Sequence, residues 1–229
     1  MADAGVRAAA SVVLVREAEP GLEVFLLRRA QTMAFAPGMH VFPGGRVDPE
    51  DHVAGRLLDG YPFAAELARA NADEPTLRAN VACALREVRE ESGVLLAPAD
   101  LVLVDHWVTP EHSPLRYDVR FFIASLPTGQ QATAQGTEMD DVAWLAPAEA
   151  VRRAEAGLLP MLLPTLRVLS FLAGFRTIDD ANTASRDRAL CPKLPRWNGR
   201  SWDLVDAYTD AVVERDVVQG PDIEGGAIR

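Results

Sequence analysis

The chain has 229 residues, of which 48% are hydrophobic and 24% charged, and its formal net charge is −10. These values are ordinary for a globular protein and allow one domain with a full core. The acidic balance argues against nucleic acid as the main partner, because binding to phosphate backbones requires clustered Lys and Arg. An anionic substrate would therefore need a local cation, such as a metal ion.

The N-terminal segment and the cysteines favour a reducing compartment. The apolar run near the N-terminus is short and lacks the features of a signal peptide, and no segment approaches the ~20 apolar residues of a membrane span. Cys83 and Cys191 lie far apart, and a domain of this size does not need a disulfide. We therefore expect a cytoplasmic protein with no membrane partner.

In chain order, the first elements are strands. Residues 8–17 and 22–30 are rich in apolar and β-branched residues and flank a Glu-Pro-Gly turn signal, which predicts a β-hairpin. A loop then leads to residues 40–42 and a Pro-Gly-Gly turn at 43–45. Between 51 and 73 the spacing of Ala and Leu predicts one or two short helices.

A longer helix is predicted to begin near Glu74, followed by Pro75, and to end before Gly93. Further strands are predicted at 101–109, 117–126 and 139–145, followed by helices and a mixed tail. This order predicts a single α/β (α+β) domain over residues 1–229, with a helical C-terminal extension at 160–229. Its apolar segment, 161–175, is either a core-covering helix or a homodimer contact.

Three glutamates share one face of the long helix. Glu87, Glu90 and Glu91 fall within an arc of about 100°, beside an apolar stripe that includes Val88. Arg86 precedes Glu90 by four residues and can pair with it. Such a group can be a solvated face of Arg–Glu pairs. Three like charges repel each other, however, and a hard divalent cation would bind them.

Together with the upstream glycine pair, this segment resembles the Nudix box: Gly, five residues, Glu, seven residues, then Arg-Glu-apolar-x-Glu-Glu-x-Gly-apolar. Gly45 matches the first glycine, and Asp51 stands where the family has Glu. The second half is matched by Arg86, Glu87, Val88, Glu90, Glu91, Gly93 and Val94. The gap between the halves, 52–85, has 34 residues instead of seven, so residues 52–78 would be an insertion of 27.

The resemblance implies an α/β/α sandwich around a mixed β-sheet and a hydrolase that splits the pyrophosphate of a nucleoside diphosphate derivative, with Mg²⁺ or Mn²⁺ as cofactor. Glu87, Glu90, Glu91 and the Gly44 carbonyl would bind the metal, and Arg86 would orient the carboxylates. Gly44 and Gly45 would let metal or phosphate approach the backbone.

An acidic loop precedes the strand predicted at 139–145. Glu138 would be a further metal ligand or the general base, and the neighbouring Asp140 and Asp141 compete for this role. His112 could also serve as a base. Glu138 is equally compatible with a loop acid in a polar turn, and a loop histidine such as His112 is more often simply solvated.

The residues around the box resemble the coenzyme A and acyl-coenzyme A diphosphatases. Arg29, or its neighbour Arg28, would bind phosphate, and Arg29 matches an arginine of that subgroup. The subgroup's Leu-Arg-x-His segment is replaced by residues 33–36, where Met33 and Phe35 would form an apolar wall or pack in a loop. The alternatives are an ADP-ribose or nucleotide-sugar diphosphatase, and a non-catalytic Nudix domain that senses a nucleotide.

Overall fold

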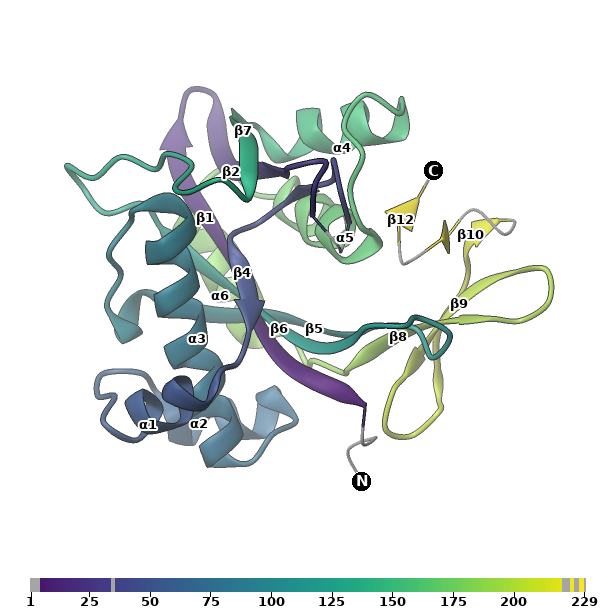
Figure 1. Cartoon of the computed structure of the whole chain (residues 1–229), viewed down its shortest axis with the longest axis horizontal. Helices are drawn as coiled ribbons and strands as arrows, with labels where there is room; N and C mark the ends of the chain where they lie inside the picture. Colours follow the sequence, from purple (N-terminus) through teal and green to yellow (C-terminus); the bar gives the residue numbers. More distant parts are fainter. Residues whose placement is uncertain (1–4, 34–35, 220–222, 225–226, 229) are drawn as a thin grey trace.

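The protein folds around a mixed β-sheet. The computed structural model describes residues 5–33, 36–219, 223–224 and 227–228. Within these ranges six α-helices cover the two faces of a ten-stranded sheet (Figure 1). Helices α1 to α3 lie on one face of the sheet, and helices α4 to α6 lie on the other. This is the expected layered α/β/α arrangement.

The elements have the following bounds. The helices are α1 (Pro49–Arg56), α2 (Phe63–Ala70), α3 (Glu74–Ser92), α4 (Pro147–Glu155), α5 (Leu163–Leu172) and α6 (Ile178–Asp187), with a 3₁₀ turn at Pro98–Asp100. The strands of the large sheet are β1 (Val6–Ala18), β2 (Gly21–Arg29), β3 (His40–Val41), β4 (Gly44–Arg46), β5 (Val102–Val108), β6 (Arg116–Ser125), β7 (Met139–Leu145), β8 (Lys193–Trp197), β9 (Ser201–Asp206) and β10 (Val212–Gln219). A separate pair is formed by β11 (Ile223–Glu224) and β12 (Ala227–Ile228).

Strand β1 lies at the centre of the sheet. The order is β10-β9-β8-β5-β6-β1-β2-β3, with β4 also paired to β1 and β7 to β2. β1 runs parallel to β6 and antiparallel to β2 and β4, as the predicted hairpin requires for β2. In this register Ser11 of β1 lies opposite both Gly44 of β4 and Phe121 of β6.

The two faces of β1 enter two separate cores. Val12 and Leu14 pack toward α3, whereas Val13 and Val15 pack toward α4 and α5, because successive side chains of a strand point to opposite faces. All four are fully buried. A strand covered on both faces reads as a continuous apolar run, which is why residues 8–17 do not alternate.

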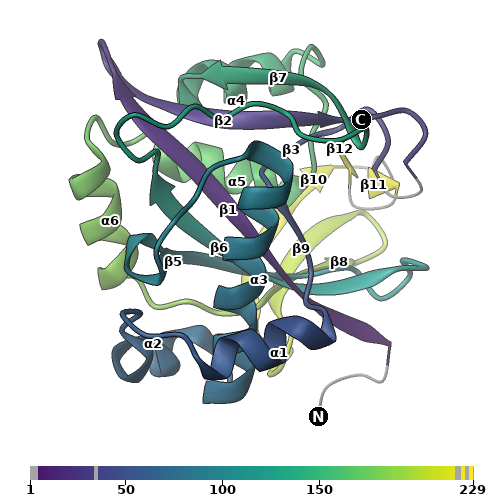
Figure 2. The same ribbon diagram turned by 60° about the vertical axis from the view of Figure 1, so that its left-hand side comes forward.

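Helix α3 begins and ends on the predicted signals. The Asp73 carboxylate accepts a hydrogen bond from the Thr76 N–H (2.9 Å), and Gly93 adopts a left-handed φ of 73° at the C-cap. Figure 2 shows α3 lying across the central strands, with α1 and α2 near its N-terminal end. Val88 is fully buried, so the glutamate face is turned away from the core.

Two expectations about local structure are wrong. Residues 44–46 form strand β4, paired with β1, and not a turn, because Gly44 allows the close approach to the β1 backbone. The C-terminal extension is helical only as far as Asp187. Strands β8 to β10 then extend the sheet beside β5 (Figure 1), since their short apolar stretches have no helical period.

The apolar segment 161–175 covers the core. Leu163, Val168, Leu169 and Leu172 of α5 are buried against the sheet, which is the first of the two predicted alternatives for this segment. Within the described ranges, no helix combines the length and hydropathy that crossing a bilayer would need.

Candidate active site

A cleft of about 570 Å³ lies between β4, β6, the C-terminal half of α3, the loop before β7 and the start of α5. Most of the residues predicted to form the site line it, namely Arg29, Gly44, Gly45, Glu87, Glu90, Glu91 and Glu138. Residues from both halves of the motif therefore lie in one place, although 34 residues separate the halves in the sequence.

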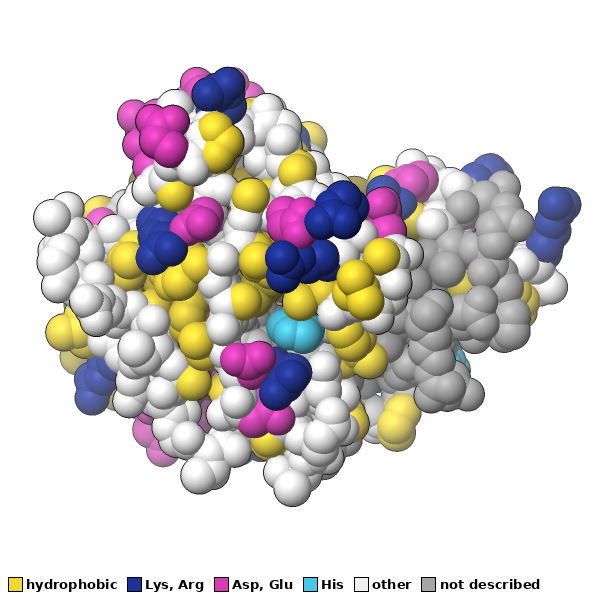
Figure 3. Space-filling model, turned by 90° about the horizontal axis from the view of Figure 1, so that it is seen from above, with side chains coloured by type: hydrophobic (Ala, Val, Ile, Leu, Met, Phe, Trp, Pro, Cys, Tyr) yellow, Lys and Arg dark blue, Asp and Glu magenta, His cyan; other side chains and the backbone are white. Residues whose placement is uncertain are grey.

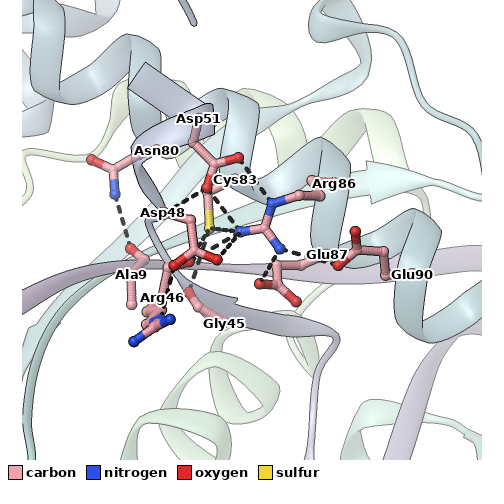
Figure 4. Close-up of polar contacts among 10 residues, drawn as sticks. All are labelled: Ala9, Gly45, Arg46, Asp48, Asp51, Asn80, Cys83, Arg86, Glu87 and Glu90. Carbon is pink, nitrogen blue, oxygen red and sulfur yellow. Dashed lines mark hydrogen bonds and ion pairs between the residues drawn. The ribbon is translucent and has the colours of Figure 1, made fainter. Parts of the chain in front are cut away.

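Arg86 connects the carboxylates behind this cleft (Figure 4). Its Nε and Nη2 donate to the two oxygens of Asp51, at 2.9 and 2.8 Å. Its Nη1 donates to Glu87 (2.7 Å) and Glu90 (3.1 Å), which confirms the predicted pairing with Glu90. A further contact, from Nη2 to the Arg46 carbonyl at 3.1 Å, fixes the guanidinium against β4. One side chain thus orders two of the three glutamates.

Asp51 supports Arg86 and does not line the cleft. It is 2% exposed, and its Oδ2 also accepts the backbone N–H of Asp48 at 2.9 Å. Asp51 is carried by α1, which packs on α3 at Gly55, where a Cβ would lie 2.7 Å from the Arg78 carbonyl. The inserted segment thus begins within α1, and the packing of this helix on α3 holds Asp51 against Arg86.

The glycine pair brings the β4 backbone against the glutamates. The Gly44 N–H donates to Glu91 Oε2 at 2.9 Å. A Cβ on Gly44 would lie 2.6 Å from the Ala10 carbonyl oxygen, and one on Gly45 would collide with the Glu87 carboxylate. Neither position accepts a side chain without a shift, so the sequence requirement for glycine here is steric.

Burial strongly affects the two inner glutamates. It raises the pKa of Glu91 to about 8, and the Gly44 N–H opposes this shift while the nearby Glu87 and Glu138 carboxylates add to it. Burial also raises the pKa of Glu87, against the opposing charge of Arg86. Glu90 is exposed. The cleft therefore concentrates carboxylates whose negative charge is costly to maintain without a cation.

The donor chemistry of the cleft suits a hard divalent ion. Carboxylate and carbonyl oxygens are the ligands that Mg²⁺ and Mn²⁺ prefer, and the glycine pair leaves the backbone accessible. In the part of the chain that the structure describes, no three Asp, Glu, His or Cys side chains converge on one point. Arg86 and the Gly44 N–H hold the glutamates along the wall instead.

The structure separates the remaining candidates. Arg29 lines the cleft, whereas Arg28 lies outside it and pairs with Asp140 (2.6 Å) and Asp141 (3.8 Å). Glu138 is exposed on the cleft wall, so it is the acid of the 138–141 group that reaches the site.

Two other candidates do not lie at the cleft. His112 packs on the Trp202 ring, with 5.3 Å between ring centroids, and is not among the lining residues. Met33 is half-buried and also absent from the lining, while Phe35 lies outside the described residues.

Sequence reasoning missed two supporting residues on α3. Cys83 Sγ donates to the Gly45 and Arg46 carbonyls at 3.5 and 3.3 Å, and Asn80 Nδ2 donates to the Ala9 carbonyl at 2.9 Å (Figure 4). Cys83 thus joins α3 to β4, which carries the glycines, and Asn80 joins α3 to β1, the strand paired with β4. They precede Glu87 by four and seven residues, so helical spacing alone would have placed them on its face.

The far wall of the cleft was also missed. It is formed by Phe42, Tyr117, Val119, Phe121, Leu162 and Thr165. The alternation along 117–121 could have indicated one face of a strand. Leu162 and Thr165 reach the cleft only through tertiary packing, for which the sequence carries no local signal.

Comparison with known proteins defines the class. Residues 70–164 match the family model of the NUDIX domain. The crystal structure of a NUDIX hydrolase from Alicyclobacillus acidocaldarius is 27% identical and superposes with a TM-score of 0.70, covering 78% of this chain and 96% of that one. Residues 70–164 therefore match a NUDIX domain, and the fold is similar to that of a Nudix hydrolase, as the motif predicts.

Two curated relatives are each 26% identical. One is a nudix hydrolase of Caenorhabditis elegans, aligned over 205 residues that cover 82% of this chain and 68% of that protein. The other is the acyl-coenzyme A diphosphatase NUDT19 of Gallus gallus, aligned over 247 residues that cover 73% of this chain and 65% of that protein. The chain thus spans about two thirds of the length of each relative.

Proposed function

We propose that this protein is a Mg²⁺- or Mn²⁺-dependent diphosphatase, which hydrolyses the pyrophosphate bond of a nucleoside diphosphate derivative to two phosphate-bearing products. The observation that supports this most is the joint placement of Glu87, Glu90 and Glu91 with the bare glycine backbone along one cleft. In a chain of net charge −10, such a cleft would bind an anionic substrate only together with a cation.

Glu87, Glu90, Glu91 and the Gly44 carbonyl would hold the metal. When bound, the ion would neutralise the diphosphate charge and lower the pKa of a water molecule. Arg86 keeps the first two carboxylates oriented toward the cleft, as outer-shell partners of metal ligands do.

Other residues of the cleft would act on the substrate. The Gly44 N–H fixes one oxygen of Glu91 and leaves the other oxygen available. Arg29, which lines the cleft whereas Arg28 pairs with Asp140 outside it, would contact phosphate oxygens. Glu138 lines the cleft and would serve as the general base for the attacking water or as a further metal ligand.

For the substrate we propose coenzyme A or an acyl-coenzyme A. The name of the Gallus gallus relative supports this choice, as does the resemblance of the segments around the motif. Replacement of the Leu-Arg-x-His segment by residues 33–36 makes ADP-ribose or a nucleotide sugar the substrate to test against it.

The test is a substrate panel with purified protein. Coenzyme A, acyl-coenzyme A, ADP-ribose and a nucleotide sugar are each incubated with Mg²⁺ or Mn²⁺, and products are separated by chromatography. Release of adenosine 3′,5′-bisphosphate from coenzyme A esters is expected. Cleavage of ADP-ribose without turnover of coenzyme A compounds would refute the substrate, and cleavage of no diphosphate in the panel would refute the activity.

A further inference from the structure

The cleft has two chemically different walls. One carries the glutamates and the β4 backbone, while the other is built from apolar side chains of β6 and of the connection between α4 and α5. Phe42 and Phe121 are buried and meet edge to face, with ring centroids 6.5 Å apart, and they form the base of the apolar wall. Val119 and Leu162 are only half-buried, so they present apolar surface to the open cleft.

The strand register sets the separation of the two walls. Across β1, Gly44 is opposite Ser11 and Ser11 is opposite Phe121, while Ala9 similarly lies between Arg46 and Val119. Adjacent strands are ~4.8 Å apart, so the β6 backbone runs ~10 Å from the glycine pair. Side chains of β6 would therefore contact a group attached within a few bonds of a diphosphate held at the glycines.

Three polar side chains lie along this wall. Ser11 Oγ already donates to the Pro43 carbonyl at 3.0 Å, Thr165 is 4% exposed, and Tyr117 is half-buried at the end of the wall that Val119 and Phe121 continue along β6. A sugar attached to the diphosphate would have to give up the hydration of its hydroxyl groups against Val119, Leu162 and Phe121. Unpaired hydroxyl groups at an apolar surface cost free energy, whereas methyl groups gain it.

We infer that Val119 and Leu162, with Phe121 beneath them, form a subsite for an aliphatic group attached next to the scissile diphosphate, and that they select such substrates against sugar diphosphates. This inference rests on the proposed diphosphatase function. Coenzyme A fits the subsite chemically, because the carbon beside its phosphate ester is bonded to a quaternary carbon with two methyl groups. The recognised feature is this arm, so the length of an acyl chain is secondary.

Polar replacements in the apolar wall test the subsite. Val119→Thr, on β6, keeps the side-chain shape and replaces one methyl group by a hydroxyl. Leu162→Asn, in the connection between α4 and α5, replaces the two terminal methyl groups by an amide of similar size. For each variant, kcat/KM is measured with coenzyme A and with ADP-ribose. We expect a loss of roughly 10-fold or more for coenzyme A and less than about 2-fold for ADP-ribose. If ADP-ribose is not cleaved, its inhibition constant against coenzyme A hydrolysis replaces kcat/KM.

Leu158→Asn is the matched control, since Leu158 belongs to the same connection but is 71% exposed and does not line the cleft. It is expected to leave both substrates unchanged. Equal losses for coenzyme A and ADP-ribose in both cleft variants, or no loss in either, would overturn the subsite while leaving the diphosphatase function intact. A wild-type protein that cleaves no diphosphate would instead refute the function itself.

Discussion

At the scale of single residues, Arg86 holds the two halves of the Nudix motif together. Its guanidinium binds Asp51 of α1 through both carboxylate oxygens and reaches Glu87 and Glu90 of α3. Asp51 is almost completely buried and pairs through two charge-assisted hydrogen bonds, so its loss would leave part of a half-buried cation without a partner.

Replacing Asp51 by Asn is expected to lower kcat/KM by about 10- to 100-fold, because outer-shell partners of this kind tune ligand orientation and metal affinity. A steady-state assay with Mg²⁺ checks this, together with a thermal melt that should show a lower Tm. Asp48→Asn is the control, since the Asp48 carboxylate lies 4.0 Å from Arg86 and Asn also serves at a helix N-cap. Equal losses of kcat/KM in the two variants would show that activity does not depend specifically on the pairing of Asp51 with Arg86.

Sequence alone indicated the chemistry of these residues but not all of their positions. Helical spacing placed Glu87, Glu90 and Glu91 on one face, and it did not depend on what preceded the helix. The position of Asp51 depends on how residues 52–78 fold back, and this is decided by packing of α1 on α3. Short-range patterns therefore could not say whether Asp51 belonged to the site.

At the scale of elements, the contact of α1 with α3 positions Asp51. The contact is close at Gly55, where an added Cβ would lie 2.7 Å from the Arg78 carbonyl and 3.1 Å from the Ala79 nitrogen. Both obstacles are backbone atoms, so a larger residue can be accommodated only by moving one helix from the other.

Gly55→Val is therefore expected to destabilise the fold by about 1–3 kcal/mol and to reduce activity further than the lost stability explains, because Asp51 moves away from Arg86. Denaturant unfolding and kcat/KM at a temperature where the variant is folded give the two quantities. Ala54→Val adds bulk to the exposed face of the same helix and should leave both unchanged. A fully active, folded Gly55→Val protein would contradict this role for α1.

The C-terminal elements illustrate where sequence patterns fail. The helical period of 163–175 correctly indicated α5, but β8 and β9 are short strands whose apolar residues, such as Leu194 and Leu204, become recognisable only once β8 pairs with β5. The tertiary context, more than local propensity, determines such strands.

At the scale of the whole molecule, a buried polar cluster lies where β5, β6 and the β9–β10 turn meet. His106 is fully buried, with its Nε2 2.5 Å from Asp118 Oδ1, and Tyr208 donates to the other oxygen of Asp118 at 3.0 Å. Arg120 also contacts Asp118, at 3.3 Å. On the surface, by contrast, acidic and basic side chains lie beside one another in contact with solvent, as the face in Figure 3 shows.

Burial lowers the pKa of His106 below its ordinary value of 6.5, and the hydrogen bond with Asp118 only partly offsets this. The folded protein therefore binds fewer protons at this site than the unfolded chain. The free energy of unfolding is therefore unaffected by the protonation of His106 above about pH 6.5, and it decreases as the pH falls from 6.5 through the lower pKa of the folded state. Unfolding free energies between pH 5 and 8 should show this decrease, and His106→Gln should weaken it. His112→Gln, at an exposed histidine, should not. An unchanged pH dependence in His106→Gln would contradict the prediction.

The most direct test of the central proposal is a Mg²⁺ titration of coenzyme A hydrolysis by the wild-type protein and by Glu91→Gln. The wild type is expected to be inactive after chelation and to regain activity with Mg²⁺. Glu91→Gln should lose on the order of 10²-fold or more in kcat/KM at saturating Mg²⁺, because metal-ion stabilisation of phosphoryl transfer amounts to several kcal/mol. Hydrolysis that is undiminished in Glu91→Gln, or unaffected by chelation, would contradict the assignment of this cleft as a metal-dependent diphosphatase site.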